Sequence, residues 1–301
     1  MPRRFTFLAA LLTVVAACGS SAAHDTAPTT TTTTTTSTTA APTTTTTSLP
    51  RFPPAPTSGD VKALVTRTGV VVPVLGRAGT KWQVETPCSA TAVVSGGTPL
   101  YGATVVLDPG HGGKETGAVG PNGLVERDLN LVVAKLTKAD LEREGATVVL
   151  TRDRDYEMTL QDRADIARHL APLAFVSIHH NGGADGPAAK PGTETYYQHT
   201  SSTSKRLAGL LYEDVERTFA GRPGIAWFAN VDAGAKYRIG QSGDDYYGIL
   251  RLAHGVPTAI SEGLFLSASR AEADLLARPD VQAAEAQAIA HAIQRDRKSV
   301  V

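Results

Sequence analysis

The sequence has little cysteine, no excess of charge of either sign and no apolar run long enough to cross a membrane comfortably. Its 301 residues include 2 Cys, and 29 basic residues balance 29 acidic ones. A balanced charge without a basic stripe gives no electrostatic support for nucleic-acid binding, so we expect no such partner. The apolar run at residues 5–17 is shorter than the roughly 20 residues that a membrane helix needs.

Residues 1–17 have the features of a signal peptide. Arg3 and Arg4 precede the apolar run, and small residues lead directly into Cys18. This resembles the lipobox of bacterial lipoproteins, where the signal is cleaved before an acylated cysteine that anchors the chain to a membrane. An ordinary cleaved signal is the alternative. Lipidation of Cys18 leaves Cys88 alone, which excludes a disulfide framework and a cysteine-based metal site.

Two further segments precede the main part of the chain. Residues 18–58 are rich in Thr and Pro and have few apolar side chains, which predicts a disordered linker, either a glycosylated stalk or a plain spacer. Short apolar runs separated by turn residues at 59–98 predict a small β-rich subdomain, loosely similar to SH3-like modules. It is either a wall-binding module or a structural extension. We expect Cys88, which has no histidine nearby in the sequence, to be a buried or half-buried thiol.

Residues 99–297 alternate between strand and helix patterns. Strands are predicted at 103–108, 146–151, 173–178, 193–198 and 257–261, and helices at 126–143, 160–170, 202–219, 271–276 and 279–295. On the first helix we expect one buried face made of Leu129, Val132, Val133, Leu136 and Ala139. The fold class is therefore α/β, with a single three-layer domain whose central, mostly parallel sheet is flanked by helices.

Potential metal ligands follow predicted strands or begin a helix. His111 lies in a glycine-rich loop, Glu126 begins a helix, and His179 follows a strand. Ligand sites of open α/β sheets form at the carboxyl ends of the strands. Two histidines and one carboxylate make a catalytic zinc site, and Glu262, after a late strand, is placed to act as the base. Taken singly, each residue has another explanation: a turn, a helix-dipole contact or an ion pair.

As a set, these segments resemble the zinc-dependent N-acetylmuramoyl-L-alanine amidases. The matching motifs are DPGHGG at 108–113, ERDLNL at 126–131, TR at 151–152, SIHHN at 177–181 and a strand ending in Glu262, with Arg163 also in place. The resemblance implies Zn²⁺ held by His111, Glu126 and His179, with Glu262 as catalytic acid/base. It also implies that the substrate is the amide between N-acetylmuramic acid and L-alanine of peptidoglycan.

Several residues around these motifs carry weaker expectations. Asn181, Tyr246 and Arg251 are candidates for substrate contact, and His180 for a place at the rim of the site or, less simply, a further ligand. Ala268 stands where the family usually has Asn. Some relatives carry a plug helix after the SIHHN motif, and residues 182–191 are too few for one.

The leading interpretation is a peptidoglycan amidase that acts in cell-wall remodelling or cell separation. We expect it to be extracytoplasmic, anchored to a membrane by its lipid, facing the cell wall, and monomeric. Two alternatives remain open: a wall-binding lipoprotein with an inactive site, and a zinc hydrolase of another amide.

Overall fold

The computed structural model describes residues 52–183, 192–222, 227 and 234–297. The predicted signal peptide, Cys18, most of the predicted linker and the segment 184–191, where a plug helix was considered, lie outside these residues. Within the described part, no helix combines the length and apolar character needed to cross a membrane.

A five-stranded antiparallel sheet comes first in the chain. Its strands are β1 (Ala63–Val65), β2 (Val71–Ala78), β3 (Lys81–Glu85), β4 (Thr91–Val94) and β5 (Thr98–Leu100), in the order β4-β3-β2-β1-β5. Leu64, Val72 and Val84 form its small buried core. Strand β5 was not predicted, because Gly96 and Gly97 read as a turn and Pro99 is rare inside strands.

The second sheet is mixed. Its strands are β6 (Val105–Pro109), β7 (Val148–Leu150), β8 (Ala174–Asn181), β9 (Glu194–Tyr197), β10 (Gly234–Lys236) and β11 (Thr258–Phe265), in the order β10-β9-β11-β8-β6-β7. All neighbouring pairs are parallel except β9 with β11. The α/β prediction is confirmed, and the single antiparallel pair makes the sheet mixed.

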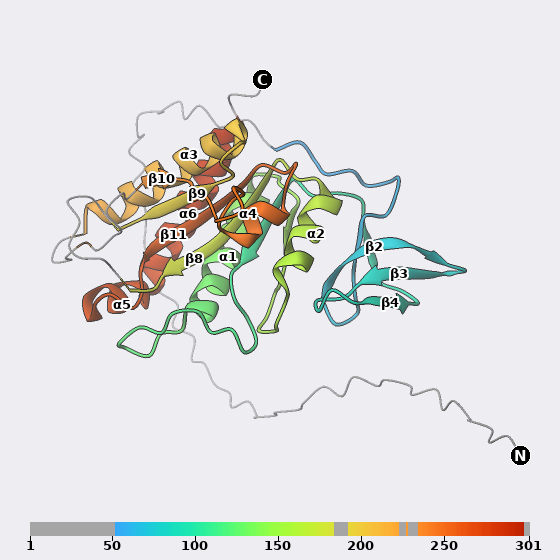
Figure 1. The fold of residues 1–301 in the computed structure, drawn as a ribbon, viewed down its shortest axis with the longest axis horizontal. Helices are drawn as coiled ribbons and strands as arrows, with labels where there is room; N and C mark the ends of the chain where they lie inside the picture. Colours follow the sequence, from blue (N-terminus) through green and yellow to red (C-terminus); the bar gives the residue numbers. More distant parts are fainter. Residues whose placement is uncertain (1–51, 184–191, 223–226, 228–233, 298–301) are drawn as a thin grey trace, which may run out of the picture. The chain divides into compact units, whose positions relative to one another are not determined.

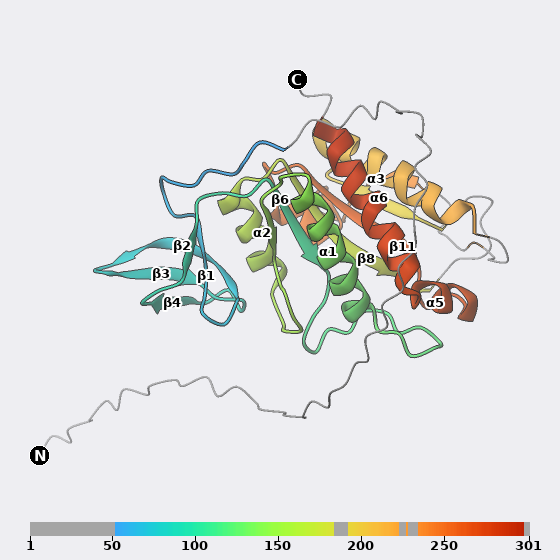
Figure 2. The same ribbon diagram turned by 180° about the vertical axis from the view of Figure 1, so that it is seen from behind.

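Helices cover both faces of this sheet, because its central strands are apolar on both sides. Val105 and Leu107 of β6 pack with residues of α1 (Glu126–Arg143), α3 (Ser202–Ala220) and α6 (Pro279–Arg297). Val106, which points the opposite way, packs with α2 (Leu160–Leu170) and α4 (Gly248–Leu252). Figure 1 shows α2 and α4 on one side, and Figure 2 shows α1 and α6 adjacent on the other. A short helix, α5 (Arg270–Leu276), precedes α6.

Two sequence predictions need correction. The expected buried face of α1 is wrong in part, because Val132 is 41% exposed and Ala139 is also exposed. The face instead includes Asn130 and Thr137, which are buried because they bond within the protein. Strands β8 and β11 also run further than predicted, so that His179 and Glu262 lie inside strands rather than after them.

Candidate active site

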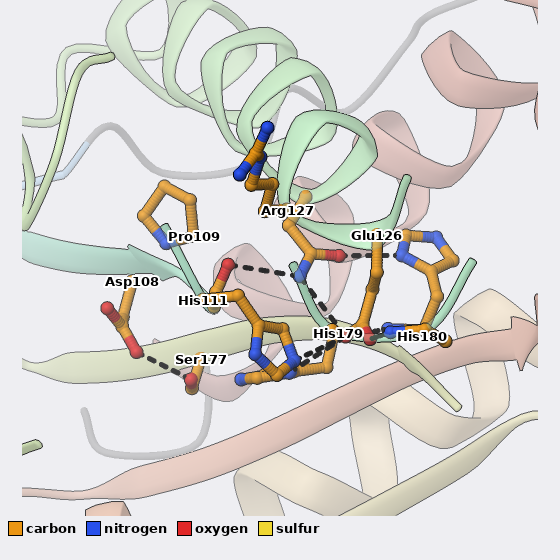
Figure 3. A network of polar contacts seen from close by, with 12 residues as sticks. Asp108, Pro109, His111, Glu126, Arg127, Ser177, His179 and His180 are labelled. Atoms are coloured by element: carbon orange, nitrogen blue, oxygen red, sulfur yellow. Dashed lines mark hydrogen bonds and ion pairs between the residues drawn. The ribbon is translucent and has the colours of Figure 1, made fainter. Parts of the chain in front are cut away.

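His111, Glu126 and His179 converge at one edge of the mixed sheet. Glu126 Oε1 lies 3.1 Å from His111 Nε2 and 3.0 Å from His179 Nδ1, and the two rings meet edge to face at 4.8 Å. Among the described residues, this trio is the one group whose His, Cys or carboxylate atoms could share a metal ion. Figure 3 shows both rings beside Glu126. Two imidazoles and a carboxylate with space alongside fit a catalytic zinc ion.

The loop after β6 brings His111 to this position at the cost of an uncommon backbone conformation. His111 has φ +63°, a left-handed value that non-glycine residues seldom adopt and that clusters at functional sites. Gly110 leaves room for His179, since a Cβ there would lie 2.1 Å from its ring. Gly117, at φ +66°, similarly lets the chain pass the Glu126 carboxylate, which a Cβ would approach to 2.3 Å.

A buried ion pair supports the base of the same loop. Arg163 of α2 donates from Nη1 to Asp108 Oδ1 at 2.6 Å and from Nη2 to the His111 carbonyl at 2.6 Å. Ser177 also donates to the Asp108 carboxylate at 2.6 Å (Figure 3), and so does Thr151, at 2.6 Å. Burial opposes the charge of Asp108, but Arg163 and these hydroxyls outweigh it and lower its pKa to about 2.

Arg152 holds the loop through main-chain oxygens. Its Nε and Nη2 donate to the carbonyls of Pro109 and Gly110 at 2.8 and 2.9 Å, and Nη2 also donates to the Arg127 carbonyl at 2.7 Å. Arg127 in turn donates to the Gly113 carbonyl. The sequence contained Arg152 and Arg163 within recognisable motifs, but it gave no signal of what they bind.

Glu262 faces the candidate metal ligands His111, Glu126 and His179 from the neighbouring strand. It pairs in register with His179 across β11 and β8, and it lines a cavity of about 310 Å³ together with His111, Glu126 and His179. Its side chain is only 8% exposed, and Oε2 has no hydrogen-bond partner among the described residues. Burial, with the charges of Glu126 and Glu194, raises its pKa well above the ordinary value.

The three candidates for substrate contact are placed differently. Asn181 lines the cavity, although its amide already donates to Glu194 at 3.0 Å. Tyr246 is 48% exposed and packs edge to face on Tyr247, the residue that lines the cavity. Arg251 lines a separate, larger cavity and donates to the Asp245 carbonyl, so its position gives no support to substrate contact.

Two further expectations are wrong. His180 borders the cavity but is not at an exposed rim, because its side chain is fully buried between Asn130 and Glu285. Because side chains alternate along a strand, His180 is expected to point opposite to His179. The sequence did not reveal which elements would cover the His180 side chain. Cys88 is exposed rather than buried, since it lies in the turn between β3 and β4.

Comparison with known proteins decides the family. The family model described as N-acetylmuramoyl-L-alanine amidase (Amidase_3) matches residues 105–295, which include all four residues of the candidate site. The chain belongs to this family. The amidase family match covers the mixed sheet and its helices and begins after the five-stranded sheet.

The relatives of this chain include proteins that are named as amidases. The chain is 34% identical to the uncharacterized protein YqiI of Bacillus subtilis over 209 residues, which cover 69% of this chain and 88% of YqiI. It is 40% identical to the B. subtilis amidase LytC over 41% of this chain and 25% of LytC. It is 38% identical to the Escherichia coli amidase AmiA over 38% of each chain. The chain therefore spans well under two thirds of these two named amidases.

Solved amidase structures share the fold. The amidase AmiC2 of Nostoc punctiforme aligns with a TM-score of 0.54 and 32% identity, over 64% of this chain and 96% of that chain. An amidase from Clostridium difficile 630 aligns with a TM-score of 0.55 and 27% identity, over 66% of this chain and 99% of that chain. The part of this chain that aligns with each structure is about as long as the part that the family model matches.

Proposed function

We propose that this amidase is a zinc enzyme that cuts the bond between N-acetylmuramic acid and L-alanine in peptidoglycan. His111, Glu126 and His179 hold the ion, and Glu262 is the acid/base. The observation that carries the proposal is the His₂Glu donor set facing, across one cavity, the buried Glu262, whose Oε2 has no hydrogen-bond partner among the described residues. Other divalent ions also accept these ligands. Direct metal analysis distinguishes them from zinc.

Bound zinc would lower the pKa of a coordinated water and polarise the scissile carbonyl. The chain's own residues supply the proton transfers. Glu262, fixed within β11, takes the proton of the attacking water and returns it to the leaving nitrogen of L-alanine. The products are a lactyl carboxylate on the sugar and a free amino terminus on the stem peptide. Asp108, Arg152 and Arg163 keep the His111 loop in place during these steps.

The test compares zinc content and digestion of purified peptidoglycan for the parent, Glu262→Gln and Glu272→Gln. Glu272 is a matched control, because it is also a fully buried carboxylate but does not line the cavity. We expect about one zinc per chain in all three. Glu262→Gln should lose about 10²–10⁴-fold in turnover, and Glu272→Gln should remain active. Free L-alanine amino termini without new reducing sugars identify the bond cut.

Two outcomes would favour the alternatives. A parent protein that binds no metal and releases nothing from purified wall would favour a wall-binding lipoprotein with an inactive site. Metal binding with turnover of other amides, but not of peptidoglycan, would favour a different zinc hydrolase.

We also propose an extracytoplasmic enzyme anchored by a lipid on Cys18, monomeric, and acting in wall remodelling or cell separation. The support is the lipobox-like sequence, the Thr/Pro-rich segment that follows it, and the similarity to the protein named "Probable cell wall amidase LytH" of Staphylococcus epidermidis. Cys18→Ala tests the anchor. The variant should move from the membrane fraction to the medium, whereas an equal membrane-bound fraction in both proteins would exclude it.

A further inference from the structure

A fully buried chain of polar side chains lies behind the metal-binding residues. His180 of β8 is between Asn130 of α1 and Glu285 of α6, and none of the three is exposed. His180 Nδ1 is 2.8 Å from Asn130 Oδ1, and His180 Nε2 is 3.2 Å from Glu285 Oε2. Most buried polar groups in proteins have a partner, so the contacts of these three side chains can be counted atom by atom; Glu285 Oε1 has none among the described residues.

The direction of the Asn130 amide follows from that count. Its Nδ2 donates to the Gly110 carbonyl and to Glu126 Oε1, each at 3.3 Å. A reversed amide would turn an oxygen toward two acceptor oxygens, one of them on a carboxylate. Asn130 Oδ1 must therefore accept, and His180 Nδ1 must be the donor. His180 thus selects the orientation in which Asn130 supports Glu126.

Glu126 depends on these contacts for its position. Oε1 receives the Asn130 amide and the main-chain N–H of His180 at 3.2 Å, and Oε2 receives the N–H of Ala118 at 2.7 Å. Partners of this kind fix the orientation of a metal ligand and its affinity for the ion. The other metal-binding side chains, His111 and His179, contact the same Oε1.

Glu285 fixes the far side of the His180 ring and also touches the strand that carries the proposed acid/base. A Cβ on Gly263, the residue after Glu262, would lie 2.4 Å from Glu285 Oε1 and 3.0 Å from His180 Nε2. Glycine at this position lets Glu285 and the His180 ring approach β11, and the contact between Nε2 and Glu285 keeps Nδ1 directed at Asn130.

From these contacts we propose that His180 is a positioning residue for the metal site. Through its Nδ1 donor it orients the Asn130 amide, and the amide orients Glu126 for the ion. The inference rests on the proposed function, because Glu126 must be a metal ligand for it to matter. His180 itself does not touch the metal or the substrate.

Two substitutions of similar polarity separate the two ends of the ring. His180→Asn keeps a donor near the place of Nδ1 and so keeps the link to Asn130. His180→Gln keeps a polar group near the place of Nε2 and so keeps the link to Glu285 alone. The measurement is the zinc dissociation constant of the full protein, by competition with a chromophoric chelator. Activity at saturating zinc is a separate readout.

We expect His180→Gln to weaken zinc binding about 10–100-fold, and His180→Asn to stay within about 3-fold of the parent. Thr137→Val is the matched control, because Thr137 is another fully buried polar residue between α1 and α6 whose hydroxyl bonds only main-chain oxygens. It should lower the melting temperature without changing zinc affinity.

Equal zinc affinities for the Asn and Gln variants, in folded proteins, would overturn the role of His180. If either His180 variant fails to fold, Glu285→Gln and Asn130→Ala replace the pair. Of these two, only Asn130→Ala removes the contact to Glu126, so only this variant should weaken zinc binding. A parent that binds zinc but hydrolyses no peptidoglycan contradicts the proposed function and leaves the positioning role intact. A parent that binds no zinc contradicts both.

Discussion

Glu262 and His179 are direct partners across the parallel strands β11 and β8. Neighbouring strands lie about 4.8 Å apart, so backbone pairing alone sets the proposed acid/base beside a proposed metal ligand. On its other side, Glu262 pairs in register with Glu194 of β9. The electrostatic environment of Glu262 is therefore fixed by two rigid strands rather than by loops.

The Glu194 pairing predicts a shift in the pH profile. The negative charge of Glu194 contributes to raising the pKa of Glu262, so Glu194→Gln should lower that pKa. A base with a lower pKa stays ionised in more acidic solution. The acidic limb of the profile of kcat/KM against pH should therefore move to lower pH.

A substitution at Lys236 should shift the pH profile in the opposite direction. Its Nζ is 2.7 Å from Glu194 Oε1, so Lys236→Met should leave the Glu194 charge less compensated and move the acidic limb to higher pH. Shifts of both variants in the same direction, or none in either, would show that Glu194 does not act on Glu262 through its charge.

Loss of Arg163 should destabilise the protein by an amount that depends on whether the Asp108 carboxylate is still present. Arg163→Met leaves a buried carboxylate without its cation, which should cost about 3–5 kcal/mol of unfolding free energy. The double variant with Asp108→Asn should recover part of this loss. Denaturant unfolding of both single variants and the double variant measures the coupling, and additive losses would contradict it.

The same pair predicts an acid dependence in the parent. The pKa of Asp108 is about 2 in the folded protein against an ordinary 3.8. Its contribution to stability is therefore present above about pH 4 and is lost as the pH falls through 2, by about 2 kcal/mol. Asp108→Asn should lack this part of the acid dependence.

Asp162 at the start of α2 predicts the opposite dependence. Its carboxylate is fully buried with no hydrogen-bond partner among the described residues, and burial with the nearby charges of Glu85 and Asp165 raises its pKa to about 8. The protein should therefore lose stability as the pH rises from about 4 to 8. Asp162→Asn, which cannot ionise, should be similar in stability to the parent at pH 4 and more stable at pH 8, by up to about 5 kcal/mol because each pKa unit is worth about 1.4 kcal/mol. A gain that is equal at both pH values would mean that ionisation is not the cause.

Gly110 predicts a local effect on the metal site. Gly110→Ala places a Cβ against the His179 ring and should weaken zinc binding by at least about 10-fold. Gly209→Ala is the control, because the position is inside α3 and no other part of the described chain lies within 4 Å of the added Cβ. Alanine favours helices over glycine, so this variant should bind zinc normally and be about 0.5–1 kcal/mol more stable.

The sequence predicted the longer helices well, since α1 and α2 have the predicted bounds. Their apolar spacing is clear, and Gly145 follows the end of α1 as a typical stop. The five-residue α4 and the edge strand β10 were missed, because neither is long enough to show a period. Strands β8 and β11 were predicted too short because polar residues interrupt their apolar runs, whereas main-chain pairing continues past them.

The four central site residues were recognisable in the sequence from motifs, but their supporting contacts were not. Arg163 reaches Asp108 across 55 positions, and His180 reaches Glu285 across 105. No periodicity or local propensity specifies such pairs, because they depend on how helices settle on the sheet. The expected place of His180 at the rim was therefore reasonable from the sequence and wrong in the structure.

Phe52 has a mechanical consequence for a chain that is held at its N-terminal end. Phe52 is buried in the main core with α1 and α6, its N–H donates to the Glu144 carbonyl, and the Pro53 carbonyl accepts from Thr104. The first described residues thus attach to the catalytic body before the chain forms β1. Tension applied through the preceding segment would be borne at Phe52 by the amidase core, and the five-stranded sheet would lie outside the path of the load.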